Sequence, residues 1–122
     1  MASLAQSRPM DDNQHAPCAH ISIATTTDNH ESARAIARAL VEARLAACVQ
    51  LSAPIESVYR WQGSVETATE WRLTIKTRAD RFANVASAIR KLHPYSVPQI
   101  LATPVVAGNA DYLAWLDESL GS

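Results

Sequence analysis

The order of apolar and polar positions predicts alternating strands and helices from about residue 19 onward. Ile21 and Ile23 alternate with Ser22 and Ala24, which is typical of a short strand with one buried face. Apolar residues then recur three and four positions apart, so an amphipathic helix is predicted after this strand. The apolar positions of that helix are Ala33, Ile36, Ala37, Leu40 and Val41.

Acidic or amide residues stand where each predicted helix begins. Asp28 precedes the first helix and Glu31 follows three residues later, so we expect a capping box of the aspartate type. Asp80 is expected to cap a second helix, and Asn109 is expected to cap a last one. The inner face of the second helix consists of Phe82, Val85, Ala86 and Ile89.

A long hairpin is predicted in the middle of the chain. Residues 49–61 read as a strand that bends at Pro54, and Gln62-Gly63-Ser64 has the composition of a turn. Residues 67–77 then alternate cleanly between apolar or threonine positions and polar ones. Strands usually have about five or six residues, so part of this hairpin should project beyond a domain of this size.

A proline-rich corner connects the second helix to the last strand, which is expected at residues 100–106. Pro94 and Pro98 flank His93 and Tyr95 closely. Proline fixes its own φ and pushes the preceding residue toward extended conformations, so the two side chains are held in a defined arrangement. Such a corner is either a functional site or a well-packed helix-to-strand connection.

These elements follow the order β-α-β-β-α-β-α. A hairpin between two crossover helices is the split βαβ arrangement of ferredoxin-like folds. The predicted fold class is therefore α+β, with an antiparallel sheet, both crossover helices on one face, and a long central hairpin. Because the projecting hairpin carries Trp61 and Trp71, it would expose unpaired edges and apolar surface unless the chain assembles.

Length and composition narrow the function classes. The 122 residues support a single domain at 19–122, preceded by a polar segment at 1–18 that we expect to be a flexible tail. The net charge of −1 supplies no basic field for nucleic acid, and no apolar run is long enough for a membrane helix. Cys18 and Cys48 are expected to be reduced, and the expected location is the cytoplasm.

Five sequence blocks occur in an order that resembles the CutA family, the divalent-cation tolerance proteins. They are VEARLAACV at 41–49, YRWQG at 59–63, Glu70 with Lys76-Thr77, HPY at 93–95 with Pro98, and DYLAWL at 111–116. The resemblance covers roughly residues 20–120. It implies a ferredoxin-like subunit in a homotrimer, with hairpins that pair between neighbouring subunits. It also implies an association with copper or other divalent metal ions.

The resemblance directs attention to three candidate metal ligands, which are His93, Glu70 and Glu66. An imidazole and carboxylates could bind Cu(II) or another divalent cation weakly. His93 could equally be a capping or hydrogen-bonding residue, and Glu66 could belong to a solvated hairpin face.

This chain also departs from the family pattern around the proposed ligands. Ala24 stands where family members often have a cysteine, and Ser96 and Gln99 stand where they often have glutamates. Three ligands that the resemblance would supply are therefore absent.

A second candidate site is a cleft at a subunit interface. Tyr59, Trp61, Lys76 and Tyr95 could line it and hold a small anion or polar ligand. The alternative is that these side chains only pack and form ion pairs between subunits, because aromatic residues are enriched in interfaces.

One further pattern lies outside the family blocks. His15, Cys18 and His20 form His-x-x-Cys-x-His, a compact set of metal-binding residue types. Only three ligands are present, and short clusters of this kind also arise by chance.

No sequence motif for catalysis is present, so we expect the protein not to be an enzyme. The first hypothesis is a trimeric protein that binds divalent metal ions and contributes to the metal-ion response. The alternatives are a trimeric module that senses a small molecule and signals to a partner protein, or a scaffold that anchors other proteins.

Overall fold

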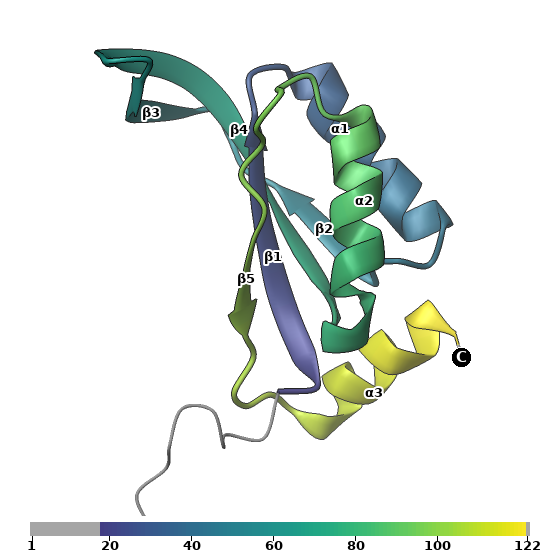
Figure 1. The fold of residues 1–122 in the computed structure, drawn as a ribbon. Coiled ribbons are helices and arrows are strands. Elements are labelled where there is room, and N and C mark those ends of the chain that lie inside the picture. Colours follow the sequence, from purple (N-terminus) through teal and green to yellow (C-terminus); the bar gives the residue numbers. More distant parts are fainter. Residues whose placement is uncertain (1–17, 122) are drawn as a thin grey trace, which may run out of the picture.

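The computed structural model describes residues 18–121 (Figure 1). The flexible tail predicted for residues 1–18 lies outside this part of the chain, apart from Cys18. The predicted element order is confirmed, except that the strand predicted at residues 49–61 forms two strands. The elements are β1 (His20–Thr27), α1 (His30–Glu42), β2 (Cys48–Leu51), β3 (Ile55–Trp61), β4 (Ser64–Arg78), the 3₁₀ turn η2 (Ala79–Arg81), α2 (Phe82–Leu92), β5 (Leu101–Pro104) and α3 (Ala110–Leu120).

The strands form one antiparallel sheet in the order β2-β4-β1-β5. The 15-residue strand β4 pairs with three other strands, and its partners change along its length. Residues 71–78 pair with β1, whereas residues 64–70 pair only with β3. The ferredoxin-like prediction is therefore confirmed, and the far part of β4 forms the projecting hairpin with β3 (Figure 1).

Two backbone features define this hairpin. The long predicted strand divides into β2 and β3 around Pro54, which confirms the expected bend. At the tip, Gln62 and Gly63 have φ values of 50° and 85° between the paired residues Trp61 and Ser64. Positive φ at both central residues matches the right-handed twist of the strands, so the turn keeps the register.

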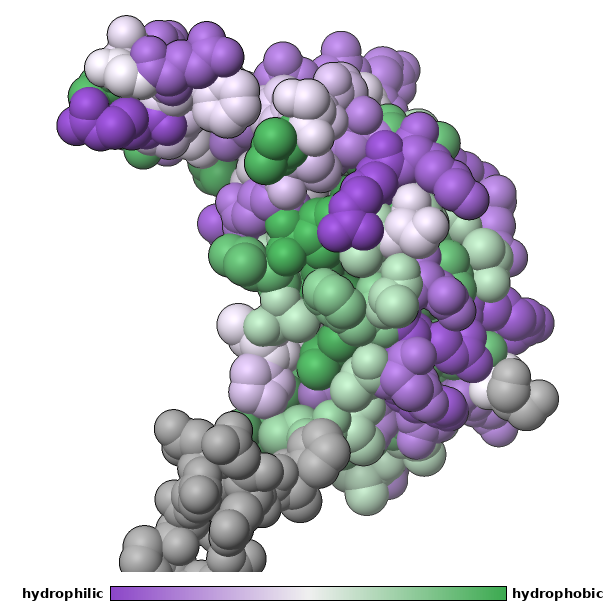
Figure 2. Space-filling model, viewed as in Figure 1, coloured by the Kyte–Doolittle hydropathy of each residue, from purple (hydrophilic) through white to green (hydrophobic). Residues whose placement is uncertain are grey.

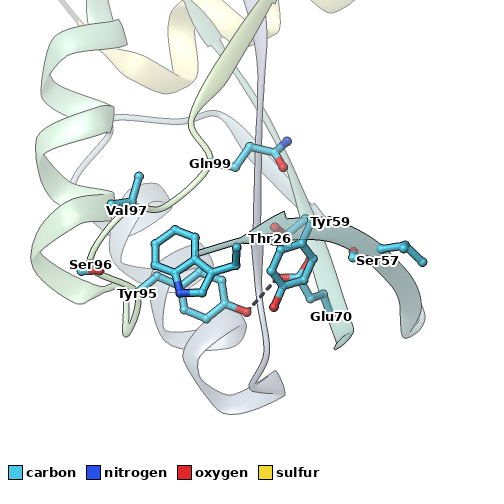
Figure 3. Close-up of a pocket in the computed structure, with 10 residues that line it drawn as sticks. Thr26, Ser57, Tyr59, Glu70, Tyr95, Ser96, Val97 and Gln99 are labelled. Carbon is cyan, nitrogen blue, oxygen red and sulfur yellow. Dashed lines mark hydrogen bonds between the residues drawn. The ribbon is translucent and has the colours of Figure 1, made fainter. Parts of the chain in front are cut away.

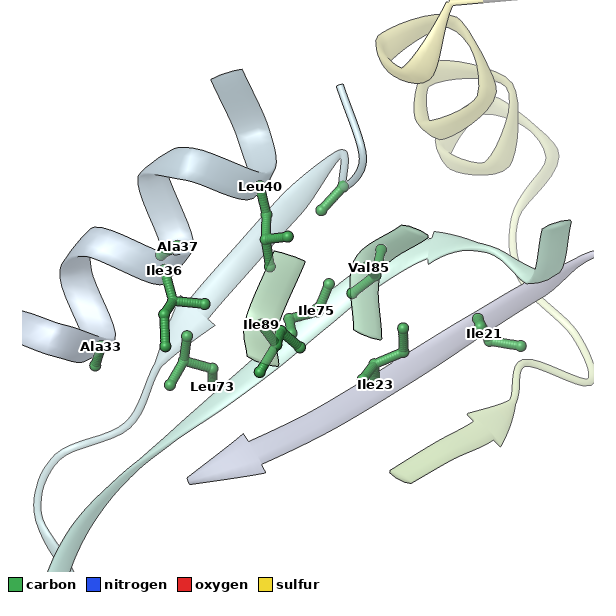
Figure 4. Close-up of a cluster of buried hydrophobic side chains, with 11 residues drawn as sticks. Ile21, Ile23, Ala33, Ile36, Ala37, Leu40, Leu73, Ile75, Val85 and Ile89 are labelled. Atoms are coloured by element: carbon green, nitrogen blue, oxygen red, sulfur yellow. The ribbon is translucent and has the colours of Figure 1, made fainter. Parts of the chain in front are cut away.

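The core lies between the sheet and the two helices α1 and α2, which cover the same face (Figures 1 and 4). Alternate residues of β1 and β4 face the apolar stripes of the helices. Burying each of these side chains contributes about 1.5–3 kcal/mol. The larger fully buried aliphatic residues of this core are Ile23, Ile36, Leu40, Leu73, Ile75, Val85 and Ile89.

Two of the predicted helix caps are wrong. Asn29, not Asp28, is the N-cap of α1, and its side-chain oxygen accepts a hydrogen bond of 2.9 Å from the Ser32 amide. Asp80 lies in η2 and accepts hydrogen bonds of 2.6 and 3.2 Å from the Arg78 guanidinium instead of capping α2. A charged donor nearby is a stronger partner for the carboxylate than a backbone amide.

The last helix starts directly after Asn109, as predicted, although the Asn109 side chain makes no capping hydrogen bond. Polar contacts hold α3 to the rest of the domain. Arg81 donates hydrogen bonds of 2.7 and 3.2 Å to the carbonyls of Arg44 and Leu120. These contacts place positive charge at the negative end of the helix.

The surface is strongly apolar below the hairpin, whereas the hairpin itself mixes polar residues with a few exposed apolar ones (Figure 2). Figure 2 shows hydrophobic residues gathered on the hollowed side of the molecule beneath the projecting hairpin. Exposed apolar residues on the hairpin include Val58, Tyr59, Trp61 and Val65, and those near β5 include Val97, Leu101 and Val106. The strand β5 is also an edge, because it pairs only with β1.

Candidate functional site

A cavity of about 670 Å³ lies between the base of the hairpin and the proline-rich corner (Figure 3). Its walls come from the end of β1, from β3 and β4, and from residues 95–99 of the corner. It is lined by Thr26, Ser57, Val58, Tyr59, Trp61, Glu70, Tyr95, Ser96, Val97 and Gln99.

The corner is fixed by His93, whose side chain is only 8% exposed. Its Nε2 lies 2.7 Å from the Thr26 carbonyl oxygen, and its Nδ1 accepts a hydrogen bond of 3.0 Å from the Tyr95 amide. A carbonyl can only accept, so Nε2 carries the proton and Nδ1 supplies the lone pair. Both ring nitrogens of this neutral imidazole are thus used within the fold.

Tyr95 continues the hydrogen bonds of His93 from the proline-rich corner into the cavity. Its hydroxyl donates a hydrogen bond of 2.7 Å to Oε2 of Glu70, drawn as a dashed line in Figure 3. Glu70 is 7% exposed at the point where β4 changes partners from β1 to β3. Burial, and then the hydrogen bond and charge of Glu70, raise the pKa of Tyr95 well above its ordinary value.

These contacts form a continuous series from the Thr26 carbonyl through His93 and Tyr95 to Glu70. The His93 and Tyr95 rings also contact each other, with 4.7 Å between their centroids. His93 therefore positions Tyr95, and Tyr95 holds one oxygen of the buried carboxylate. This series fixes the direction of Glu70 in the cavity wall.

The structure brings together four of the residues predicted from the sequence, which are Tyr59, Trp61, Tyr95 and Glu70. Lys76 is not among the residues that line the cavity. It pairs with Ser22 and Cys48, six positions along β4 from Glu70 or roughly 20 Å at the rise of a strand. Three of the four residues predicted for the cleft therefore line one cavity of the single chain, and the cleft between subunits stays a prediction.

Glu66 does not join Glu70 either. The two carboxylates are four residues apart on one strand, or roughly 13 Å at the usual rise, which is too far to share a metal ion. Glu66 lies opposite Tyr59 on the exposed hairpin. Within residues 18–121, no group of three or more His, Cys, Asp or Glu side chains is arranged to hold a metal.

Sequence reasoning missed several lining residues. Ser57 could have been found, because it shares a strand face with Tyr59 and Trp61 at a spacing of two. Thr26 could not, because its contribution to His93 is a backbone carbonyl from a segment 67 positions away.

Comparison with known proteins shows the family of this chain and of its fold. The family model described as CutA1 divalent ion tolerance protein matches residues 21–119. The divalent-cation tolerance protein CutA of Thermus thermophilus is 47% identical over 96 residues, which are 79% of this chain and 93% of that protein. This chain belongs to the CutA family.

Solved CutA structures have the same fold. CutA1 from the psychrotrophic bacterium Shewanella sp. SIB1 has a TM-score of 0.85 at 34% identity, and the match covers 88% of this chain and 100% of that chain. The periplasmic divalent cation tolerance protein CutA from Archaeoglobus fulgidus has a TM-score of 0.81 at 40% identity, covering 83% and 98% of the two chains. The fold and family resemblance predicted from the sequence is confirmed.

The metal association that the CutA name implies can be tested against the residues present. Copper(II) sites are commonly built from imidazole nitrogens together with oxygen ligands. Both nitrogens of His93 are engaged, and one oxygen of Glu70 is held by Tyr95. A single chain therefore offers one carboxylate oxygen and the neutral groups of Ser96 and Gln99, which do not make a tight metal centre.

The His-x-x-Cys-x-His pattern is only partly within the described residues, because His15 lies outside them. His20 is paired within the fold, since its Nε2 lies 2.9 Å from Oδ1 of Asp117 on α3. Cys18 is a free cysteine. Metal binding by this pattern stays a prediction.

None of the helices in the described part of the chain is long and apolar enough to cross a membrane.

Proposed function

We propose that this chain is a non-enzymatic, homotrimeric divalent-cation tolerance protein that acts in the cytoplasm. The observation that carries the proposal is the CutA family match over residues 21–119. The names of relatives give other compartments, because an Arabidopsis thaliana relative is named CutA, chloroplastic, and the Archaeoglobus fulgidus relative is called periplasmic. Growth of a host that lacks this protein, with and without the restored gene, should differ under excess Cu(II); equal growth would contradict the tolerance role.

The exposed hairpin supports a homotrimer. Val58 and Val65 are each 64% exposed, and β3 and β5 both present unpaired backbone edges. Pairing the hairpin of one subunit with an edge of the next would cover both in a closed ring.

The trimer proposal is tested by placing a charge on the hairpin. Val65→Asp should convert the trimer to monomer, measured by analytical ultracentrifugation, because the carboxylate would be buried in the interface. Ala83→Asp introduces the same charge on an exposed position of α2 and should leave the trimer intact. A monomeric wild-type protein would overturn the proposal.

We propose further that divalent ions are bound weakly, as exchangeable cargo. Glu70 supplies a carboxylate oxygen from the cavity wall, and His93 acts by positioning. Calorimetry of the tagless trimer with Cu(II) should give weak saturable binding that Glu70→Gln reduces. Unchanged binding in that variant would remove Glu70 from the site.

A second function is favoured by the cavity itself. A volume of about 670 Å³ with aromatic walls and a few polar groups is typical of a small-molecule site. Sensing of a small molecule, with signalling to a partner protein, is therefore the alternative function.

A further inference from the structure

The charge on the cavity wall is negative. Its ten lining residues include one carboxylate, Glu70, and no lysine, arginine or histidine. The acidic side chains of Glu70 and Asp28 both act on Tyr95 and favour its neutral form. An anionic ligand would be repelled here, whereas a cation would be attracted.

Glu70 has one carboxylate oxygen, Oε1, that is available to a ligand. The Tyr95 hydroxyl occupies Oε2, and within residues 18–121 no ion pair involves this carboxylate. Because Glu70 is 7% exposed, a cation that reached Oε1 would be largely removed from water. Charge-assisted hydrogen bonds are stronger in such an environment.

Aromatic rings complete the walls. Tyr59 and Trp61 line the cavity, and they are 44% and 47% exposed. In Figure 3 the Tyr59 side chain lies beside the hydrogen bond between Tyr95 and Glu70. A cation over the face of tyrosine or tryptophan is attracted by the ring quadrupole.

The carboxylate and the aromatic rings together favour one class of cation over another. A divalent metal ion would need several converging ligand atoms, and the described residues supply one free carboxylate oxygen at this site. An organic ammonium ion needs one carboxylate, aromatic faces for its adjacent carbon atoms, and space. The cavity offers all three. We propose that it binds a small organic ammonium cation, with the nitrogen at Glu70 and the carbon skeleton against Tyr59 and Trp61.

This inference goes beyond the metal-tolerance function and does not depend on it. The test uses the full chain in its assembled state, with EDTA present so that metal ions play no part. The probes are benzylammonium, the neutral benzyl alcohol and the anionic benzoate, which have similar size and different charge. Binding is measured by tryptophan fluorescence and by the shift in melting temperature.

We expect saturable binding of benzylammonium that is about tenfold tighter than that of benzyl alcohol, with benzoate the weakest. Glu70→Gln keeps the shape and an acceptor for Tyr95, so it should weaken benzylammonium about tenfold and leave benzyl alcohol unchanged. Glu66→Gln removes the same charge four residues along β4, outside the cavity, and should have no effect. Trp61→Phe should remove the fluorescence change.

Several results would overturn the proposal. One is benzoate binding as tightly as benzylammonium, and another is equal loss of binding in Glu66→Gln and Glu70→Gln. A third is the absence of saturable binding to the assembled wild-type protein, which would mean that a neighbouring copy fills the cavity. Cu(II) calorimetry without EDTA is read separately, and Cu(II) binding that persists when benzylammonium does not bind overturns this proposal alone.

Discussion

His93 shows how the position of a residue decides its chemistry. The sequence marks the corner around it as rigid, and the prolines explain that rigidity. Whether an imidazole binds metal or holds the fold depends on what its two nitrogens contact. Those contacts are a distant carbonyl and a nearby amide, and backbone groups carry no signature in the sequence. The alternative of a well-packed connection is the one that the structure supports for His93.

Replacing His93 should therefore affect stability. His93→Ala removes both hydrogen bonds and leaves the Thr26 carbonyl and the Tyr95 amide without these partners. We expect the free energy of unfolding to fall by about 2–3 kcal/mol, measured by urea denaturation at fixed protein concentration. Lys91→Ala, an exposed change two residues earlier, should cost far less. Equal effects of the two substitutions would contradict the positioning role.

Tyr95 gives the site a specific dependence on alkaline pH. Its pKa is raised by burial and by Glu70, so the folded chain keeps the phenolic proton where the unfolded chain, with a pKa of about 10, loses it. The contribution of Tyr95 to stability is therefore complete below about pH 10 and declines as the pH rises further.

This dependence can be measured by comparison with Tyr95→Phe, which does not titrate. The difference in unfolding free energy between wild type and Tyr95→Phe should shrink from about pH 9 to about pH 11. A difference that stays constant over this range would show that Glu70 and burial do not perturb the tyrosine.

At the level of elements, the alternation of β4 and the helical periods predict the fold well. Residues such as Leu73 and Ile75 face the core as the alternating pattern requires. Helix starts are less well predicted, because Asp28 and Asn29 are adjacent and both are good N-caps. Only the backbone path selects Asn29, whose side chain reaches the Ser32 amide.

Two substitutions at the hairpin tip should change the stability of the protein in opposite directions. Gly63→Ala should destabilise the protein by about 1 kcal/mol, because φ is 85° there and the added Cβ meets no atom within 4 Å. Gln62→Asn should instead stabilise it slightly, since asparagine tolerates the positive φ of 50° better. Both effects are measured by urea denaturation. Destabilisation by both substitutions would contradict this account of the turn.

For the whole molecule, the sequence predicts the projecting hairpin and several residues of the cavity beneath it, but not where the cavity lies or all of its walls. The cavity forms where the hairpin base meets the corner, and these segments are about 25 residues apart in the chain at Glu70 and Tyr95. No local pattern specifies such a meeting. Lys76 lies outside the cavity of the single chain for the same reason, because a strand face extends further than one cavity, and its place in a subunit interface stays a prediction.

Assembly should be visible in the thermal stability of the whole protein. If folding and trimer formation are coupled, the melting temperature rises with protein concentration. We expect this rise for the wild type, followed by calorimetry over a hundredfold dilution range, and its loss in Val65→Asp. A melting temperature independent of concentration in both proteins would argue against coupled assembly.

The pairing of His20 with Asp117 has a practical consequence. It places the start of β1 beside the last helix, at the end of the domain opposite the hairpin tip (Figure 1). A fluorophore, affinity handle or surface tether joined near residue 18 or residue 121 would thus be remote from the aromatic cavity. Immobilised protein should remain open to titration with small molecules, which makes biosensor measurements practical for this chain.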